Sequence, residues 1–479
     1  MKNHEVASAK RIRRLFVANR GEIALRVVKA CRALDIQVVV GVSEADVETM
    51  AAHLADAFET IGPAPAGESY LHIERVISAA RRAGCDALHP GYGFLSERPA
   101  FARACAAAGI TFVGPSPEAI ESMGDKITAV SLAAAAGVPR VPGSGALRDY
   151  EQALRLAQEI GYPILIKATA GGGGRGMRVV RDASELPELM DSAANEARSA
   201  FGDGTVYMEK FIEEARHIEI QVMGDHFGNV VHLGERDCST QRRHQKLIEE
   251  SPSPVVSEGL RMQMADCAVQ LARRAAYVGA GTVEFVVDAR DNRFYFLEMN
   301  TRIQVEHPVT ELVTGFDLVA EQIRVAQGLP LSFMQKDVML RGHAIECRIN
   351  AEDPNKNFLP KPGLISLWSP PATEGVRLDS HCYTGYRVPQ FYDSLIAKLI
   401  VHGDTRAQAI ENMRQALKAF RIEGIPSTVA FHLEVMNEEA FIDGSITTRW
   451  VEQTFLPARK ARQKAAAEAA KAVVQEMQL

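Results

Sequence analysis

The sequence lacks any hydrophobic run long enough to cross a membrane, because no stretch of about 18 consecutive apolar residues occurs in its 479 residues. The amino-terminal segment is basic, but only the short run 15–18 follows it before Asn19. That run is too short for the hydrophobic core of a secretion signal. These absences predict a protein that neither enters nor crosses a membrane.

Cysteines are few, and their spacing excludes two classes of small stabilised protein. The chain has seven, scattered between positions 31 and 382, with no Cys-x-x-Cys pair and no histidine at the spacing of a zinc ligand. An odd number without paired spacing excludes a disulfide framework, and the missing ligand pattern excludes a structural zinc site. Reduced thiols in a cytoplasmic protein are therefore expected.

No excess of basic residues is present, since 54 Lys and Arg stand against 60 Asp and Glu and give a net charge of −6. A general affinity for nucleic acid is excluded, and any anion site must be a local cluster. The hydrophobic share of 47% and the charged share of 24% are those of an ordinary soluble enzyme. The length predicts two to four domains.

The first 120 or so residues alternate short apolar runs with helical patterns. Runs at 15–18, 36–42, 87–89 and 110–113 surround a helical pattern at 22–33. This βαβ order predicts a parallel sheet. The turn after the first run lacks the Gly-x-Gly-x-x-Gly that a dinucleotide needs for close backbone approach, so a dinucleotide cofactor is not expected there.

Turn-forming residues divide the rest of the chain into further regions. A boundary is expected near Gly124, where a helix running to Ala136 begins, and strands in hairpins are expected from there to about residue 325. A third region, 341–451, combines short strands with a long helix at 406–419. The last stretch, 457–479, has good helix formers but a thin apolar stripe, which predicts an exposed helix.

A glycine-rich segment lies between two predicted strands. Lys167 ends an apolar strand, four glycines follow at 171–174, and a second strand begins at Met177. Adjacent glycines allow backbone N–H groups to approach phosphates closely. A Walker A loop is excluded, because no Gly-Lys-Ser/Thr follows and the next element is a strand. We interpret the segment as a phosphate flap rather than a linker, with Lys126 and Lys167 as cations for the phosphates.

Two glutamates mark a candidate metal site. A hairpin centred on Asp291 would set Glu284 opposite Glu298, with Asn300 on the same face. Carboxylates at that distance repel unless a divalent cation lies between them, and Mg²⁺ prefers a few carboxylates plus phosphate oxygens. The alternative is a solvent-facing polar stripe, which the neighbouring aromatic residues disfavour.

Continuing that strand would place Arg302, Gln304 and Glu306 on the metal-bearing face. A cation, an amide and a carboxylate are the groups needed to hold a small oxyanion and remove its proton. The segment 236–246 adds a dense basic run that ends in Lys246. Taken alone such a run is a solvated face, and it gains meaning only beside the other motifs.

With these motifs assembled, the chain resembles biotin carboxylase, the ATP-grasp component of biotin-dependent carboxylases. The similarity extends from about Leu15 to Trp450. It rests on the motifs FVANRGEIA at 16–24, HPGYGFLSE at 89–97, the glycine flap, ERDCS at 235–239, RRHQK at 242–246, EMNTRIQVEHPVTE at 298–311 and ECRINAED at 346–353.

The resemblance implies an α/β protein with an ATP-grasp fold, flanked by an amino-terminal parallel α/β domain and a carboxy-terminal α+β domain. The expected boundaries are 11–124 for the first domain, 125–328 for the ATP-grasp domain with a lid at about 141–212, 341–453 for the third domain and 457–479 for the helical tail.

The resemblance also implies roles for individual residues. The ATP ligands would be Lys126, Lys167, Gly173, Gly174, Met177, Glu209, Lys210, His217, Gln241, His244, Glu284 and Glu298. The ligands of Mg²⁺ or Mn²⁺ would be Glu284, Glu298 and Asn300, and the bicarbonate ligands would be Lys246, Arg302, Gln304, Val305 and Glu306. Arg348 would face the ureido oxygen of biotin, Tyr92 would border the biotin site, and the catalytic set would be Glu306, Arg302, Lys246 and Arg348.

The implied reaction is the ATP-dependent carboxylation of biotin by bicarbonate through carboxyphosphate. The family's biotinyl domains carry a Met-Lys-Met turn that is missing here, so biotin is expected on a separate biotin carboxyl carrier protein. We further expect a homodimer that works with a carboxyltransferase subunit. Acetyl-CoA is the expected final acceptor, with pyruvate, 2-oxoglutarate or another acyl-CoA as alternatives.

Two other functions fit part of the pattern. Another ATP-grasp ligase would form an acyl phosphate from a different carboxylate, but Lys246, Arg302 and Glu306 together favour bicarbonate. A non-catalytic ATP sensor would be expected to lack the base or the metal carboxylates, whereas Glu306, Glu284 and Glu298 are all present.

Overall fold

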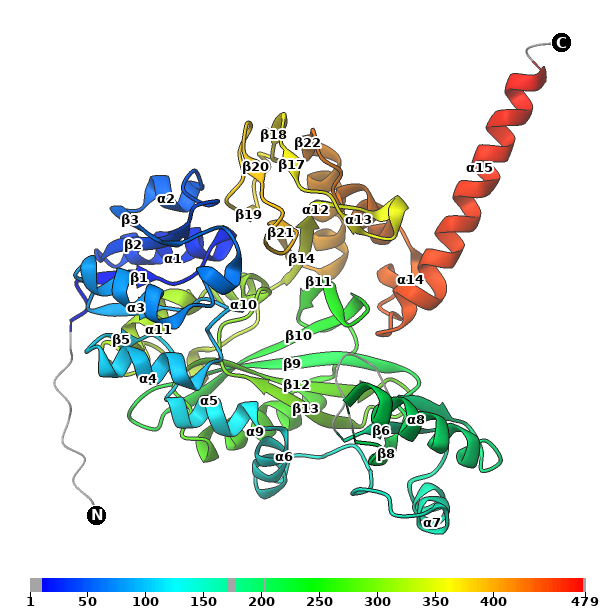
Figure 1. The fold of residues 1–479 in the computed structure, drawn as a ribbon. Helices are drawn as coiled ribbons and strands as arrows, with labels where there is room; N and C mark the ends of the chain where they lie inside the picture. Colours follow the sequence, from blue (N-terminus) through cyan, green and yellow to red (C-terminus); the bar gives the residue numbers. More distant parts are fainter. Residues whose placement is uncertain (1–10, 170–176, 202, 477–479) are drawn as a thin grey trace, which may run out of the picture. The chain divides into compact units, whose positions relative to one another are not determined.

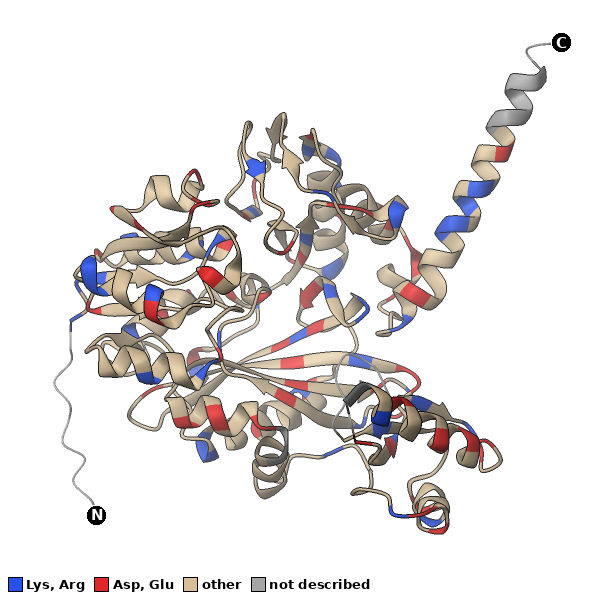
Figure 2. Ribbon diagram, in the orientation of Figure 1, with Lys and Arg blue, Asp and Glu red and all other residues tan. Residues whose placement is uncertain are grey.

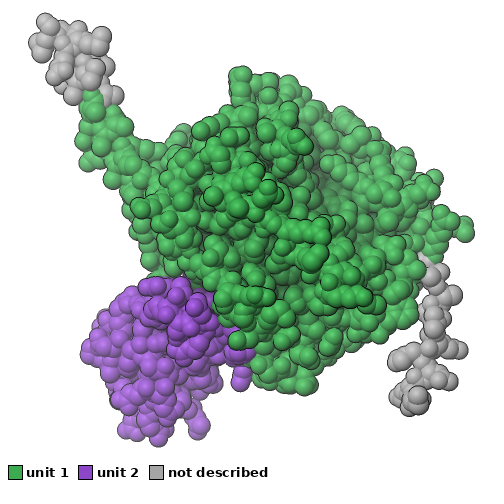
Figure 3. Space-filling view, turned by 180° about the vertical axis from the view of Figure 1, so that it is seen from behind, with its two compact units in different colours: residues 1–138, 216–285, 297–479 green, residues 139–215, 286–296 purple. Residues whose placement is uncertain are grey.

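The structure is a computed structural model that describes residues 11–169, 177–201 and 203–476. It divides into two units, which are described separately. The first comprises 1–138, 216–285 and 297–479, and the second comprises 139–215 and 286–296 (Figure 3). Among the described helices, none combines the length and apolar composition needed to cross a bilayer.

The first unit begins with the predicted parallel sheet, ordered β3-β2-β1-β4-β5 (Figure 1). Its strands are β1 (Arg14–Val17), β2 (Gln37–Ser43), β3 (Ala57–Gly62), β4 (Ala87–His89) and β5 (Thr111–Phe112). The helices of this region are α1 (Gly21–Ala33), α2 (Met50–Leu54), α3 (Ile73–Arg82), α4 (Pro99–Ala107), α5 (Pro117–Gly124) and α6 (Lys126–Ala135). The side chain of Asp125 caps α6 by accepting from the Thr128 N–H, which separates α5 from α6.

A large eight-stranded sheet follows, ordered β13-β12-β9-β10-β11-β14-β21-β19. Most of its residues belong to the first unit, and the end of β12 and the start of β13 fall in the second. Its strands are β9 (Ala215–Gly224), β10 (Val230–Arg242), β11 (Gln245–Ser251), β12 (Gly279–Asp288), β13 (Phe294–Asn300), β14 (His343–Asn350), β19 (Val376–Ser380) and β21 (Leu395–Gly403). The helices of this region are α9 (Glu258–Arg274), α10 (His307–Thr314), α11 (Leu318–Ala326), α12 (Arg406–Ala419), α13 (Val429–Met436), α14 (Glu439–Ile442) and α15 (Leu456–Glu476). Short strand pairs join β15 (Glu352–Asp353) to β16 (Leu359–Pro360), β17 (Gly363–Leu364) to β20 (Arg387–Val388) and β18 (Leu367–Ser369) to β22 (Arg421–Glu423).

Alternation along β14 and β21 separates an apolar face of this sheet from a charged one. Ile345, Cys347 and Ile349 join Leu399 and Val401 in a buried core with α12. The residues between them point to the opposite face, because successive side chains of a strand alternate. Charged residues of both signs lie on strands of this sheet (Figure 2). The apolar core thus supports the charged face from behind.

The second unit contains the predicted strand pair around the glycine flap. β6 (Ile164–Ala168) pairs antiparallel with β7 (Arg178–Val180) and with β8 (Val206–Lys210), and the unit also holds α7 (Tyr150–Ile160) and α8 (Leu186–Phe201). Gly173 and Gly174 lie outside the described residues. The hairpin expectation is therefore confirmed for the strands on either side of the flap.

The carboxy-terminal segment forms a single helix, as the sequence predicts. A π-helical turn at Val451–Phe455 leads into α15, and most side chains at 460–469 are exposed. All seven cysteines are unpaired, and six of them are buried, with Cys267 on α9 half-buried. This agrees with the expected reduced thiols.

Candidate active site

The charged face of the large sheet gathers residues from distant parts of the chain around one lysine. The Nζ of Lys246, at the start of β11, lies 2.6 Å from Glu306 Oε1, 2.5 Å from Glu219 Oε2 and 2.9 Å from Glu284 Oε1. Only 12% of its side chain is exposed. Burial disfavours an ammonium, but these carboxylates outweigh that effect and raise the pKa of Lys246 well above its ordinary value. The lysine is therefore a fixed positive charge.

Glu306 lies between this lysine and Arg348. Its Oε2 accepts from Arg348 Nη2 at 2.9 Å, and only 2% of its side chain is exposed. Burial alone would raise the pKa of Glu306, but the charges of Lys246 and Arg348 overcome burial and hold the pKa well below its ordinary value. The carboxylate is ionised and can accept a proton, as a general base must.

The segment that carries Glu306 does not continue β13, so the predicted strand through 301–308 is wrong. β13 ends at Asn300, and α10 begins at His307 with Pro308 in its first turn, leaving 301–306 as irregular backbone with Glu306 at the helix N-cap. Proline suits the first turn of a helix, because its missing N–H would have no partner there. The predicted side chains still converge, through this irregular backbone rather than by strand alternation.

Arg302 and Gln304 each donate to one of the predicted metal ligands from this segment. Gln304 Nε2 donates to Glu284 Oε1 at 2.7 Å, and Arg302 Nη2 donates to Asn300 Oδ1 at 3.0 Å. Arg302 Nε also donates to Glu97 Oε2 at 3.0 Å. The structure thus brings the predicted bicarbonate ligands next to the predicted metal ligands.

The predicted metal ligands differ in exposure. Glu284 is buried, and the charges of His217 and Lys246 overcome burial to lower its pKa, whereas Glu298 is exposed. Partial desolvation and then the charge of Glu284 raise the pKa of Glu298. Two carboxylates that repel each other, one of them open to solvent, suit a divalent cation. The Asn300 side-chain oxygen is engaged by Arg302, so its ligation would require that hydrogen bond to break.

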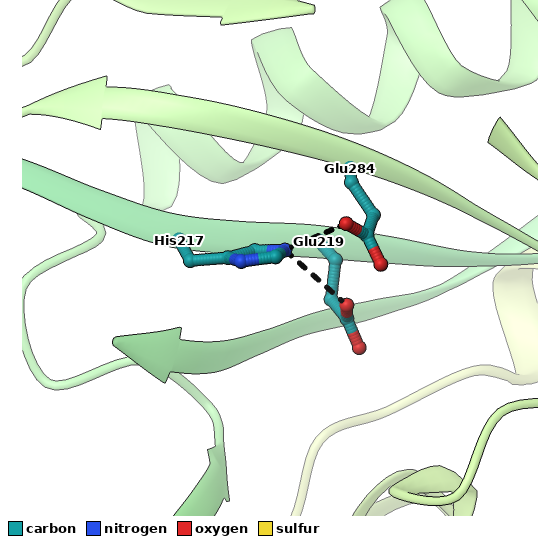
Figure 4. A group of neighbouring side chains, drawn as sticks. All are labelled: His217, Glu219 and Glu284. Atoms are coloured by element: carbon teal, nitrogen blue, oxygen red, sulfur yellow. Dashed lines mark ion pairs between the residues drawn. The ribbon is translucent and has the colours of Figure 1, made fainter. Parts of the chain in front are cut away.

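A second trio of possible ligands is less suited to a metal. Figure 4 shows His217 directed at two carboxylates, with its Nε2 2.9 Å from Glu284 and 3.8 Å from Glu219. Both oxygens of Glu219 are already paired, one with Arg236 Nε at 2.6 Å and one with Lys246. Glu219 is therefore neutralised by protein cations, whereas Glu298, the exposed partner of Glu284 in the predicted pair, is open to a cation from solvent.

Arg236, which sequence reasoning did not single out, fixes the centre of the site. It is fully buried, and each of its N–H groups has a partner. Nε donates to Glu219. Nη1 donates to Gln221 at 2.6 Å and to Thr310 at 3.0 Å. Nη2 donates to Thr282 at 3.1 Å and to Gln304 at 2.6 Å. The alternation His217-Ile-Glu219-Ile-Gln221 was the available signal, because it places three polar side chains on one strand face.

Of the predicted biotin neighbours, Arg348 lies on the charged face, and Tyr92 lies in the loop after β4. Arg348 Nε donates to Glu249 Oε1 at 2.5 Å, and burial raises the pKa of Glu249 to about 7. The hydroxyl of Tyr92 donates to Glu22. Burial raises the pKa of Tyr92 well above its ordinary value, and the charge of Arg348 is near enough to act in the opposite direction. Glu249 and Glu22 are further residues that the sequence reasoning missed.

The remaining predicted ATP ligands are divided between the units. In the second unit Lys167 pairs with Glu209, Met177 is half-buried, and Lys210 Nζ donates to the carbonyls of Gly161 and Tyr162 at 2.9 and 2.8 Å. In the first unit Gln241 is buried and donates to Cys238 O at 3.3 Å, and His244 is exposed in the turn between β10 and β11. Lys126 is the first residue of α6.

Three family profiles match this chain. They are the biotin carboxylase N-terminal domain over residues 11–120, the carbamoyl-phosphate synthase L chain ATP binding domain over 125–334, and the biotin carboxylase C-terminal domain over 346–453.

Relatives extend the match over nearly the whole chain. Biotin carboxylase 1 of Bacillus subtilis is 53% identical over 442 residues, which cover 92% of this chain and 98% of that protein. One pyruvate carboxylase subunit, from Methanothermobacter thermautotrophicus, is 53% identical over 92% of this chain and 89% of that protein. The biotin carboxylase domain dimer of the Hydrogenobacter thermophilus 2-oxoglutarate carboxylase, solved with MgADP, ADP and bicarbonate, has a TM-score of 0.83 and 47% identity over 92% of this chain and 97% of that one. With a basic and acidic cluster of this geometry and relatives this similar, the chain belongs to the biotin carboxylase family of ATP-grasp, ATP-dependent ligases.

Proposed function

We propose that this chain carboxylates biotin on a separate carrier protein, with bicarbonate as the carboxyl source, ATP as the energy source and acetyl-CoA as the final acceptor of the carboxyl group. The observation that carries the first half of this proposal is the position of Glu306 between Lys246 and Arg348. A base held between two cations suits a substrate that is itself an anion and carries a proton to be removed.

Bound bicarbonate would interact with Lys246, which now pairs with the Glu306 carboxylate. Lys246 and Arg302 would bind its oxygens, with Gln304 and the backbone of Val305 fixing its orientation. Once Lys246 is shared with a second anion, it stabilises the Glu306 carboxylate less, so the carboxylate becomes more basic. The arrangement therefore activates the base when its substrate is present.

The chemical steps follow from these positions. Glu306 accepts the bicarbonate proton, a bicarbonate oxygen attacks the γ-phosphate of ATP, and carboxyphosphate and ADP result. Carboxyphosphate decomposes to CO₂ and phosphate, the phosphate takes the N1′ proton of biotin, and N1′ attacks CO₂. Arg348 would stabilise the negative charge that develops on the ureido oxygen. Mg²⁺ or Mn²⁺ held by Glu284 and Glu298 would neutralise charge on the ATP phosphates.

A bicarbonate-dependent ATPase assay with free biotin tests this function. We expect phosphate release to require bicarbonate, and labelled bicarbonate to appear in carboxybiotin. Phosphate release with another carboxylate in place of bicarbonate would identify a different ATP-grasp ligase. ATP binding without any turnover would identify a sensor.

The metal assignment makes a separate prediction. Glu298→Gln should raise the Mg²⁺ concentration needed for half-maximal activity by about tenfold, because a lost ligand weakens the hold on the cation. The fold should be unaffected, since Glu298 is exposed. Glu118→Gln, which removes another exposed carboxylate with a 75% exposed side chain, is the matched control. An unchanged metal titration for Glu298→Gln would contradict the assignment.

The proposed carrier is tested on the purified chain. We expect no signal on a streptavidin blot, slow turnover of free biotin, and a higher rate when a biotinylated carrier domain is added, because tethering presents the ureido group at high effective concentration. Covalent biotin on any lysine of this chain would overturn the separate-carrier proposal. Recovery of the native complex with a transferase acting on pyruvate or 2-oxoglutarate would overturn acetyl-CoA as acceptor.

A further inference from the structure

A fully buried lysine lies behind the proposed bicarbonate site. Lys398 is in the middle of β21, in the otherwise apolar run Leu-Ile-Ala-Lys-Leu-Ile-Val, and none of its side chain is exposed. Lysine is almost never fully buried unless it is paired. Its position therefore requires partners, and the structure provides them in two directions.

In the first direction, Lys398 contacts the segment that carries the base. Its Nζ donates to the backbone carbonyl of Val305 at 2.9 Å. Lys398 stands directly opposite Arg348 in the antiparallel β14–β21 pair, and side chains of directly opposite residues point to the same face. This cross-strand pair thus contacts two neighbouring residues. Lys398 donates to the carbonyl of Val305, and Arg348 donates to the carboxylate of Glu306.

This contact completes the anchoring of the backbone around Val305. The carbonyl of Gln304 accepts from Nδ1 of His307 at 2.8 Å, and the carbonyl of Val305 accepts from Lys398. Because each peptide unit is planar, fixing a carbonyl also fixes the N–H on the other side of the same unit. The N–H groups of Val305 and Glu306 are therefore both held in direction, and in the proposed function bicarbonate would bind beside them.

In the second direction, Lys398 contacts the proposed biotin side. Its Nζ is 3.1 Å from Glu22 Oε2 and 3.8 Å from Asp379 Oδ2, and Glu22 accepts from the hydroxyl of Tyr92. The same ammonium is near enough to the buried carboxyl of Glu346 to act on its charge. Removing the lysine would leave Glu22 and Asp379 as buried acidic groups with less compensation.

We propose that Lys398 is a positioning residue for bicarbonate-dependent ATP cleavage, which acts by fixing the Val305 carbonyl and thereby the N–H and the carboxylate of Glu306, beside which bicarbonate would bind. This inference rests on the proposed function. Because Lys398 is fully buried, its effect would pass through the 304–306 backbone. Lys398 also compensates the buried charge of Glu22, and neutralising Glu22 by substitution separates this effect from the positioning role.

The test uses Lys398→Met in the full chain, both alone and combined with Glu22→Gln, with Glu22→Gln as the reference for the double variant. Methionine keeps an unbranched apolar stem as far as the fourth side-chain atom and lacks the terminal amine donor of lysine. The readouts are kcat and KM for bicarbonate and for ATP in bicarbonate-dependent ATP cleavage without biotin, together with the thermal unfolding midpoint.

We expect Lys398→Met to lower kcat/KM for bicarbonate by about tenfold to a hundredfold, the effect of a small displacement in a reacting geometry, with KM for ATP changed less than about twofold. Neutralising Glu22 should restore much of the unfolding midpoint but not kcat/KM for bicarbonate. If Lys398→Met alone does not fold, kcat/KM for bicarbonate is compared between the double variant and Glu22→Gln, and a lower value in the double variant supports the positioning role.

If the double variant recovers kcat/KM for bicarbonate as well as the thermal unfolding midpoint, the positioning role is overturned. The effect of Lys398 would then be explained by compensation of the buried charge of Glu22. An equal rise of KM for ATP and for bicarbonate would also overturn it, because the segment 304–306 would not be the affected part. Absence of bicarbonate-dependent cleavage in the unmodified protein would instead reject the proposed function, so the two failures are distinguishable.

Discussion

Glu306→Gln should lower bicarbonate-dependent phosphate release by about 10² to 10⁴, which is the usual contribution of a positioned general base. Glutamine preserves the size of the side chain, but its single oxygen can replace only one of the two acceptors that Lys246 and Arg348 now use, and it cannot take the proton of bicarbonate. The loss should appear in kcat more than in KM for ATP. Direct titration of ATP binding should give nearly the same affinity as the unmodified protein.

The same substitution should also lower stability. Glu306 compensates Lys246 and Arg348 from a buried position, and its pKa is held well below its ordinary value by those charges. A depressed carboxyl pKa contributes stability that is present above the ordinary pKa and is lost as pH falls through the depressed one. The unfolding midpoint of Glu306→Gln should therefore fall below that of the unmodified protein near neutral pH. Near-normal turnover would remove Glu306 from the role of base.

Arg236→Met should destabilise the first unit by about 3–5 kcal/mol, the cost of breaking a buried ion pair by removing one partner. The arginine joins β9, β12, α10 and the 301–306 segment through its N–H groups. Its removal leaves Glu219 with Lys246 as its remaining close cation and leaves the Gln304 oxygen without its donor. Denaturant unfolding, followed by the fluorescence of Trp368 and Trp450 in this unit, measures the change.

Arg82→Met is the matched control for Arg236→Met. Arg82 belongs to the same unit, its side chain is 56% exposed, and it pairs with Glu59 at the surface, an ion pair of the kind that contributes about 0–1 kcal/mol. Arg236→Lys separates charge from geometry, because it keeps the cation but loses the planar fork of donors. Equal stability of Arg236→Met and Arg82→Met would show that the network contributes little beyond its packing.

The sequence predicted elements whose signals are local. The amino-terminal βαβ order, the strands around the glycine flap, the helix at 406–419 and the exposed final helix depend on periodicity and turn residues, and the structure confirms them. The strand predicted through Glu306 was wrong because a helix start at His307-Pro308 overrode the alternation of polar residues. Arg302, Gln304 and Glu306 were predicted together from their residue types, and the structure places them beside Asn300, Glu284 and Lys246 respectively.

The residues that were missed depend on contacts between distant strands. Arg236 on β10 donates to Thr282 on β12 across 46 positions in sequence, and Glu249 on β11 accepts from Arg348 on β14 across 99. Neither separation has a periodic signature, since strand order in a sheet is a tertiary property. A single charged residue in an apolar strand, such as Lys398 in β21, was the one local sign that a buried partner existed.

The burial of the cysteines makes the unmodified chain suited to site-selective labelling. Six of the seven thiols are enclosed, and Cys267 on α9 is the one with partial exposure. Burial and the neighbouring Asp266 raise the pKa of its thiol, so attachment of a maleimide dye would proceed faster on the alkaline side of neutrality, where more thiolate forms. A fluorophore at this single position would report changes in the surroundings of α9 without a cysteine-free background.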